Sequence, residues 1–174
     1  VGAQSIKNYN NRQPIVTLNN AQGGDNSSLS TTALTFWGGS LPSNYNIIIT
    51  SGQHYGQMQL TNPYGDPILQ STFGIYSGGV AGVPASFITQ NRYAAVLSGV
   101  NSTSYFSGGI VPSGNYDNMN WTLALQSGSS TTWDLIFTGT SLTQTQSSLA
   151  SHARKLSRTL NSASLISNIS NSNT

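Results

Sequence analysis

Cysteine and glutamate are both absent from this chain of 174 residues. Without cysteine the chain can form neither a disulfide framework nor a thiolate metal site. Charge of either sign is scarce as well. Asp, Glu, Lys and Arg make up 6% of the residues, whereas a typical soluble domain carries about 25%. So little charge gives weak repulsion between molecules, which favours a protein that associates with its own copies or is shielded by glycans.

The scarcity of titratable groups also argues against catalysis. The chain has two histidines and four aspartates, and the aspartates are scattered along it. Nothing local brings two carboxylates together for glycoside hydrolysis, His54 has no second ligand at metal-binding spacing, and no G-x-S-x-G elbow occurs. We therefore expect a protein that is not an enzyme, with no catalytic, cofactor-binding or metal-binding residues.

Long apolar runs are missing too, since none approaches the roughly 18 residues of a membrane-spanning helix. The sequence begins at Val1 without a charged and apolar leader. That beginning is compatible with a mature secreted protein and equally with a boundary inside a longer chain. Taken with the low charge, it leads us to expect a location outside the cell, at a cell surface or at a virion surface.

Uncharged polar residues take the place of charge, because Ser, Thr, Asn and Gln supply 75 of the 174 residues. Disorder is not expected for residues 14–139, since disordered chains combine few aromatic residues with high charge and this chain has three Trp, eight Tyr and five Phe. N-x-S/T sequons occur four times and are candidate glycosylation sites in a secreted protein. Their asparagines are Asn26, Asn101, Asn120 and Asn168.

Apolar and polar residues alternate with a period of two through most of the region 14–139, which predicts short strands separated by turns. We expect strands at 14–18, 34–37, 45–50, 55–60, 68–76, 85–89, 93–99, 103–106, 121–126 and 132–138. About eight to ten short strands with few helical stretches predict an all-β domain, an antiparallel β-sandwich or jelly roll. The chain then divides into a polar N-terminal arm (1–13), this β domain (14–139) and a C-terminal helix with a polar tail (140–174).

The clearest local structure is a hairpin in residues 120–139. Trp121, Leu123 and Leu125 share one face of the first arm, and Trp133 leads the matching face of the second. The turn Ser-Gly-Ser-Ser joins the two arms, so both tryptophan-led faces are expected to reach the same core.

One short motif occurs three times: an aromatic residue, a spacer, Gly-Gly and, a few residues later, proline. The copies start at Phe36, Tyr76 and Phe106. Their spacing is too uneven for a solenoid repeat. No lysine or helix start stands beside them, which excludes a phosphate-binding loop. We interpret each as a sheet corner, where the glycines allow a bend and the proline ends the ladder.

After Gly139 the glycines and aromatic residues vanish and the pattern becomes helical. Leu149, Ala153, Leu156 and Leu160 follow a 4-3-4 spacing that makes a narrow apolar stripe. His152 and three of the six basic residues lie off the stripe. Three alternatives stay open for this helix: docking on its own sheet, packing on a neighbouring subunit, or binding an anionic partner. So few positive charges are a small footprint for nucleic acid, which we do not expect as a partner.

These observations favour a structural protein that self-assembles into an extracellular filament, coat or capsid-like layer, with copies of itself as partners. The N-terminal arm could add as a strand to a neighbour's sheet edge. Candidate subunit contacts are Ile15, Val16, Leu18, Leu149, Leu156 and Leu160.

The alternative is a glycan- or receptor-binding head of a virus spike, virus fibre or bacterial adhesin. Aromatic faces next to amide and carboxylate groups suit sugar rings and their hydroxyls. Candidate glycan contacts are His54, Tyr55, Tyr64 and Asp66.

Overall fold

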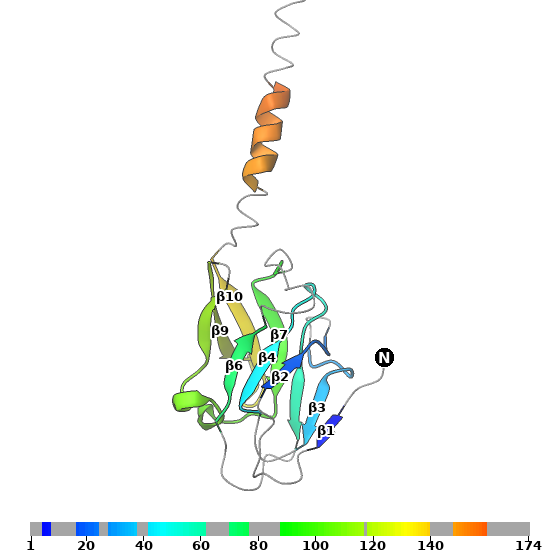
Figure 1. Cartoon of the computed structure of the whole chain (residues 1–174), viewed down its shortest axis with the longest axis vertical. Helices are drawn as coiled ribbons and strands as arrows, with labels where there is room; N and C mark the ends of the chain where they lie inside the picture. Colours follow the sequence, from blue (N-terminus) through cyan, green and yellow to red (C-terminus); the bar gives the residue numbers. More distant parts are fainter. Residues whose placement is uncertain are drawn as a thin grey trace, which may run out of the picture.

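Over the residues that it describes, the computed structural model shows a predominantly β protein with two sheets and one α-helix (Figure 1). It describes residues 5–7, 17–24, 28–37, 42–61, 70–76, 88–116, 118–139 and 148–159. The strands are β1 (Ser5–Lys7), β2 (Thr17–Asn20), β3 (Leu34–Trp37), β4 (Asn44–Ile47), β5 (Met58–Thr61), β6 (Thr72–Ile75), β7 (Arg92–Ser98), β8 (Ser113–Tyr116), β9 (Met119–Leu125) and β10 (Trp133–Thr138). Two short 3-10 helices, η2 (Thr103–Tyr105) and η3 (Ser107–Gly109), precede β8.

The strand pairing is mixed rather than antiparallel. The larger sheet has seven strands in the order β1-β3-β5-β7-β10-β9-β8, and the smaller has three in the order β2-β4-β6. All pairs among β1, β3, β5 and β7, and all pairs in the smaller sheet, are parallel. Among the named strands, the antiparallel pairs are those that β10 makes with β7 and β9, and β8 with β9; Ile49 and Tyr55 form a further, isolated antiparallel bridge. The prediction of a purely antiparallel fold is therefore wrong, while the choice between a sandwich and a jelly roll stays a prediction.

The parallel pairing has a simple origin in the path of the chain. From β1 to β7 successive strands alternate between the two sheets, so each strand lies beside the strand that came two positions earlier. Parallel neighbours need a long connection, and here the strand in the opposite sheet supplies it. Period-two alternation predicts which face of a strand is buried, but it carries no information on the direction of the neighbouring strand.

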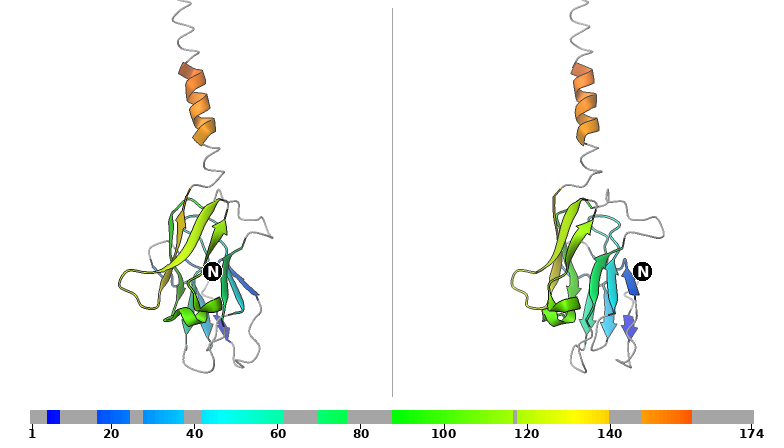
Figure 2. Two further views of the ribbon diagram at one scale, coloured as in Figure 1. Left: turned by 90° about the vertical axis from the view of Figure 1, so that its left-hand side faces the viewer. Right: turned by 60° about the vertical axis from the view of Figure 1, so that its left-hand side comes forward.

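One hydrophobic core joins the two sheets. The larger sheet is curled (Figure 2), and Trp121 of β9 meets Phe73 of β6 with ring centroids 5.8 Å apart. Tyr45 of β4 contacts Phe73 edge-on at 5.6 Å, and Phe106 contacts Trp133 in the same way at 5.3 Å. The largest fully buried side chains are Tyr45, Tyr55, Tyr93, Phe36, Phe106, Ile47, Ile49, Met58, Ile88, Leu97 and Leu135.

The predicted hairpin is confirmed. β9 and β10 pair antiparallel with Trp133 opposite Leu125, Leu135 opposite Leu123, and Phe137 opposite Trp121. Gln126 and Thr132 close the turn with a 2.8 Å backbone hydrogen bond. The strand predicted at 34–37 is confirmed as β3, and six other predicted strands overlap β2, β4, β5, β6, β7 and β9 with shifted ends.

Other local predictions differ from the structure. The stretch predicted as a strand at 103–106 contains the 3-10 helix η2, because the hydroxyl of Ser102 accepts a hydrogen bond from the Ser104 N–H and starts a helical turn there. β1 and β8 were not predicted, since neither shows apolar alternation. Most of 85–89 lies outside the described residues.

Residues 148–159 form an α-helix, as the apolar stripe predicts. It stands beyond the end of β10, clear of both sheets (Figure 1), and every one of its residues is exposed. In the part of the chain that the structure describes, no helix has the length and apolar character needed to cross a membrane.

Candidate functional site

Titratable side chains are few and do not converge among the described residues. No group of three His, Cys, Asp or Glu residues that could hold a metal is found there. Asp134 is the one acid in the described ranges, and it is buried and bonded to Arg92 and to the Ala95 N–H. Asp25, Asp66 and Asp117 lie outside the described residues. The described part of the chain therefore offers no acid–base pair.

The candidate glycan contacts are not brought together on the described surface. His54 is exposed at the end of a turn in which its N–H is 3.0 Å from the Ser51 hydroxyl. Tyr55 is fully buried, with its ring against Tyr93 at 5.1 Å and its hydroxyl donating to the Ala94 carbonyl at 2.8 Å. Because Tyr55 alternates with exposed His54, its ring points into the core and offers no face to a sugar. Tyr64 and Asp66 lie outside the described residues.

A buried amide network was not anticipated from the sequence. Gln57 is completely buried; its Oε1 accepts from the Ser30 N–H at 2.9 Å, and its Nε2 donates to the carbonyls of Ser28 at 2.9 Å and Ala94 at 2.8 Å. Asn20 donates to the Gln57 carbonyl at 2.9 Å and lies 3.1 Å from the Tyr45 hydroxyl. All these side-chain groups are hydrogen-bonded within the fold, so the network ties Asn20, Ser28 and Ser30 to the sheets and is not a ligand site.

Burial also perturbs two tyrosines near this network. The pKa of Tyr45 is raised because burial disfavours the charged phenolate, with a smaller opposing effect from the Asn20 hydrogen bond. Burial likewise raises the pKa of Tyr93, against hydrogen bonds from Thr89 and Gln90. Both phenols are therefore structural and stay protonated in the folded protein near neutral pH.

Two of the four sequons fall within the described residues. Asn101 is exposed in the loop that leads to η2, and Asn120 is exposed in β9. The Asn120 side chain accepts a weak hydrogen bond from Asn115 at 3.4 Å. Asn26 and Asn168 lie outside the described residues. Because glycan acceptors favour surface loops, Asn101, which lies in a loop, is the better candidate of the two.

Three of the six candidate subunit contacts fall within the described residues. Leu18 of β2 is partly buried against the core, whereas Leu149 and Leu156 are each 65% exposed on the helix. Ile15, Val16 and Leu160 lie outside the described residues.

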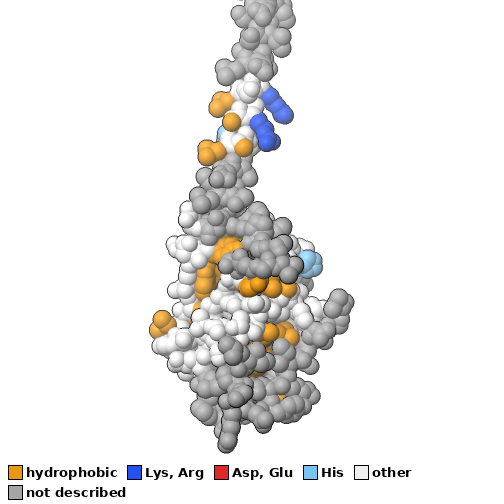
Figure 3. Space-filling view, in the orientation of Figure 1, with side chains coloured by type: hydrophobic (Ala, Val, Ile, Leu, Met, Phe, Trp, Pro, Cys, Tyr) orange, Lys and Arg blue, Asp and Glu red, His pale blue; other side chains and the backbone are white. Residues whose placement is uncertain are grey.

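The helix separates its side chains by type (Figure 3). Hydrophobic side chains follow one side and the basic side chains follow the other. At 100° per residue, Leu149, Ala153 and Leu156 fall within about 60° of one another around the axis. The basic residues Arg154, Lys155 and Arg158 centre on the opposite side of the helix. The helix therefore carries an exposed apolar stripe on one side and a basic face on the other.

Comparison of the chain with protein-family models, with curated proteins and with solved structures found no match. The function of the chain must therefore be argued from the geometry of its own residues.

Proposed function

We propose that this chain is a non-enzymatic structural protein whose copies self-assemble into an extracellular filament, coat or capsid-like layer. The observation that carries the proposal is the exposed leucine stripe of the helix over residues 148–159, with each leucine 65% exposed. Helices in water gain most of their stability from burying an apolar face. A helix of 12 residues that buries no such face needs another surface to cover it.

A second copy of the helix suits this stripe better than another kind of partner. The spacing of Leu149, Ala153 and Leu156 is that of the seam positions of a coiled coil, and Leu142, Leu160 and Ala163 continue the same register in the sequence. The three basic residues occupy outer positions, so two helices can meet along the stripe without bringing like charges together. The positions that flank the seam hold Ala150, His152, Ser157 and Thr159.

The N-terminal arm contributes less to this proposal than the sequence suggested. Ser5–Lys7 pair with β3 of the same chain as the parallel edge strand β1. Donation of these residues to a neighbour's sheet would first break that pairing. The helix is therefore the primary contact between copies, and strand addition by the arm is a secondary one.

The size of the full chain in solution tests the proposal. Sedimentation velocity and negative-stain microscopy of the unmodified protein are expected to show oligomers or polymers at micromolar concentration. The double variant Leu149→Gln, Leu156→Gln is expected to sediment as a monomer, because each substitution removes a seam side chain and leaves the sheets untouched. A matched control, Arg154→Gln with Arg158→Gln, changes the outer face of the same helix and is expected to keep the assembly.

Three results would contradict self-assembly through the helix. They are a monomeric unmodified protein, an unchanged assembly in the leucine variant, and an assembly lost in the arginine control. The third result would point to an anionic partner of the basic face. A monomer that binds immobilised glycans would instead support the receptor-binding head, which the burial of Tyr55 makes the weaker alternative.

A further inference from the structure

Strand β6 forms one edge of the three-stranded sheet, because β4 is its sole strand partner among the described residues. The N–H groups of Thr72 and Tyr76 donate to Ser43 and Ile47 on the β4 side, at 2.8 and 2.9 Å. Main-chain groups of successive residues in a strand point to opposite sides. The N–H and C=O groups of Phe73 and Ile75 therefore point outward, away from β4.

On the outer side of β6, the chain pairs briefly with the segment around Phe106 at Ser71, just before the strand begins. The Ser71 N–H donates to Tyr105 at 2.8 Å, and the Ser71 carbonyl accepts from the Ser107 N–H at 2.9 Å, which makes a parallel bridge between Ser71 and Phe106. Gly108 and Gly109 follow with φ of 71° and 68°, a conformation that favours glycine. They turn the chain away from β6. The Gly-Gly motif thus interrupts a strand pairing, and no strand among the described residues pairs with the outward groups of Phe73 and Ile75.

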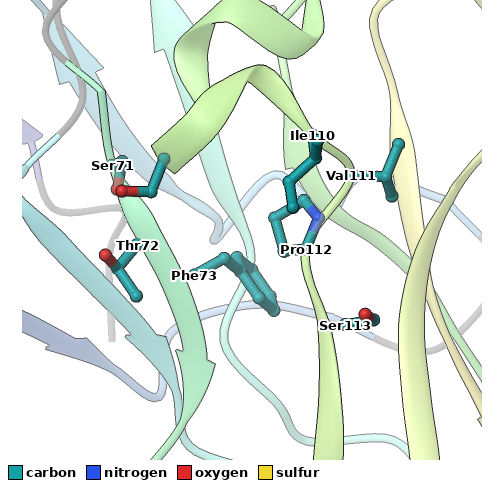
Figure 4. A pocket seen from close by; sticks show the side chains of 8 residues that line it. Ser71, Thr72, Phe73, Ile110, Val111, Pro112 and Ser113 are labelled. Carbon is teal, nitrogen blue, oxygen red and sulfur yellow. The ribbon is translucent and has the colours of Figure 1, made fainter.

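The diverging segments border a cavity of ≈ 160 Å³ that opens to the surface (Figure 4). It is lined by Ser71, Thr72, Phe73, Ser107, Ile110, Val111, Pro112 and Ser113. One wall comes from β6 and the other from the segment that leads into β8. A dry protein cavity of about 150 Å³ can hold a benzene-sized molecule. The cavity therefore has the volume for one aromatic ring.

The cavity also contains an unpaired polar group. Ser71 is 1% exposed, and its hydroxyl oxygen has no hydrogen-bond partner among the described residues. The other buried polar side chains in the described ranges, those of Asn20, Gln57 and Asp134, are all hydrogen-bonded. A buried hydroxyl without a partner is unfavourable, so an occupant with a polar atom on its ring would satisfy it.

We propose that this edge binds an extended peptide of a partner protein, which continues the three-stranded sheet beyond β6 and places one tyrosine side chain in the cavity. The peptide main chain bonds to the outward groups of Phe73 and Ile75, in the row that Ser71 begins. The tyrosine ring lies among Phe73, Ile110 and Pro112, and its phenol bonds to the Ser71 hydroxyl. Strand addition of this kind takes affinity from main-chain hydrogen bonds and specificity from side-chain pockets. The inference does not depend on assembly through the helix.

Titration of the full chain with short peptides tests the site. The probes are acetyl-Thr-Val-Tyr-Val-Thr-amide and its relatives with Phe or Ala at the centre, followed by amide chemical shifts of the ¹⁵N-labelled protein. The tyrosine peptide is expected to bind and to shift the amides of Phe73 and Ile75. The phenylalanine peptide is expected to bind several-fold more weakly because the Ser71 hydroxyl stays unpaired. The alanine peptide is expected to give no saturable shift.

Two variants separate the edge from the cavity. Ile75→Pro removes an outward N–H that β4 does not use and is expected to weaken the tyrosine peptide about tenfold, whereas Ile75→Val keeps the N–H and the affinity. Ser71→Ala is expected to make the tyrosine and phenylalanine peptides bind equally. It keeps the backbone bridge and so stays informative even where Ile75→Pro proves unstable by urea unfolding.

The inference is overturned by three results: no binding of the tyrosine peptide at about 1 mM, binding shifts that avoid β6, or a preference for tyrosine that survives Ser71→Ala. The leucine variant of the helix keeps peptide binding if the two surfaces are independent, so failure of self-assembly and failure of this site can be told apart.

Discussion

The carboxylate of Asp134 in β10 accepts a 2.8 Å hydrogen bond from the main-chain N–H of Ala95 in β7. Ala95 has a φ of 51°, a left-handed conformation that a non-glycine residue seldom adopts. The register of β10 against β7 explains this unusual backbone conformation. Trp133 pairs with Leu97 and Leu135 pairs with Tyr93. Asp134 therefore lies opposite the three residues 94–96 of β7. Asp134 thus stabilises a bulge by bonding to the N–H that the bulge removes from the ladder.

Substitution of this carboxylate is expected to destabilise the fold. Asp134→Ala leaves the buried Ala95 N–H without an acceptor, which costs about 1–3 kcal/mol of the free energy of unfolding. Arg92, whose Nε lies 2.7 Å from the second oxygen, has a side chain 48% exposed, so loss of the ion pair adds at most about 1 kcal/mol. Urea unfolding followed by tryptophan fluorescence measures the change.

The variant Asp134→Asn is the matched control, because it keeps one oxygen for Ala95 and removes the charge. We expect it to lose less than Asp134→Ala, and Arg92→Ala to lose about 1 kcal/mol or less. Equal losses in the alanine and asparagine variants would show that the ion pair, and not the bulge N–H, is the important interaction.

The buried amide of Gln57 gives a second prediction. Gln57→Leu keeps similar volume but leaves the Ser30 N–H and the Ser28 carbonyl without their Gln57 partner, while the Ala94 carbonyl keeps its bond from the Tyr55 hydroxyl. At about 1–3 kcal/mol for each of the two unsatisfied groups, the loss in unfolding free energy is expected to be about 2–6 kcal/mol. Gln59 lies two residues on and is exposed, so Gln59→Leu is expected to change stability by less than about 0.5 kcal/mol. Similar losses in both variants would contradict an anchoring role for Gln57.

Stability is expected to fall at alkaline pH. Burial raises the pKa of both Tyr45 and Tyr93, so above the usual tyrosine pKa of about 10 the unfolded chain releases protons that the folded protein retains. The unfolded state then binds fewer protons, and the free energy of unfolding, fully present below about pH 10, decreases as the pH rises further. Urea unfolding from pH 8 to 11 measures this slope.

Tyr45→Phe supplies the control for the pH dependence, because it removes one of the two titrating groups. Its stability is expected to be lower at pH 8, where the bond between Tyr45 and Asn20 is lost, but to decrease less steeply above about pH 10. An unmodified protein with the same stability at pH 8 and pH 11 would refute the protonated assignment of these buried phenols.

The two core tryptophans are expected to respond differently to the same substitution. The Trp133 indole N–H donates to the buried Val100 carbonyl at 2.7 Å, whereas the structure shows no hydrogen bond from the Trp121 indole to a described residue. Trp133→Phe is therefore expected to cost about 1–3 kcal/mol more than Trp121→Phe, through the unsatisfied carbonyl. Thermal or urea unfolding compares them, and equal losses would mean that ring volume alone decides.

A strand could be predicted from the sequence where the pattern that produces it lies within a few neighbouring residues. β3 and the β9–β10 hairpin were predictable because alternation and a Ser-Gly-Ser-Ser turn lie within a few residues of each other. β1 and β8 carry no apolar alternation. β1 forms by pairing with β3, which is distant in the chain, whereas β8 pairs with β9, which directly follows it. The stretch at 103–106 looked like a strand, but the Ser102 cap turned it into a 3-10 helix.

The residues of the two proposed sites also differ in whether a local sequence pattern could reveal them. Leu149 and Leu156 were predictable as an apolar stripe because helical spacing is local. That both leucines are exposed, and so free to contact another surface, was known only from the structure. Ser71 meets Ile110 and Pro112 in one cavity although it is distant from them in sequence. Serine is so common in this chain that no local signal marks Ser71.

By itself the sequence determined a charge-poor β protein with buried alternate residues and a striped C-terminal helix, because burial preference and helical spacing act between near neighbours. The tertiary structure alone decided that strands alternate between two sheets and pair largely in parallel. It also decided that Asp134 meets Ala95 and that β6, at the edge of the smaller sheet among the described strands, lies beside a cavity. These features depend on contacts between residues far apart in the chain, where the pattern of one segment says nothing of the direction or register of its partner.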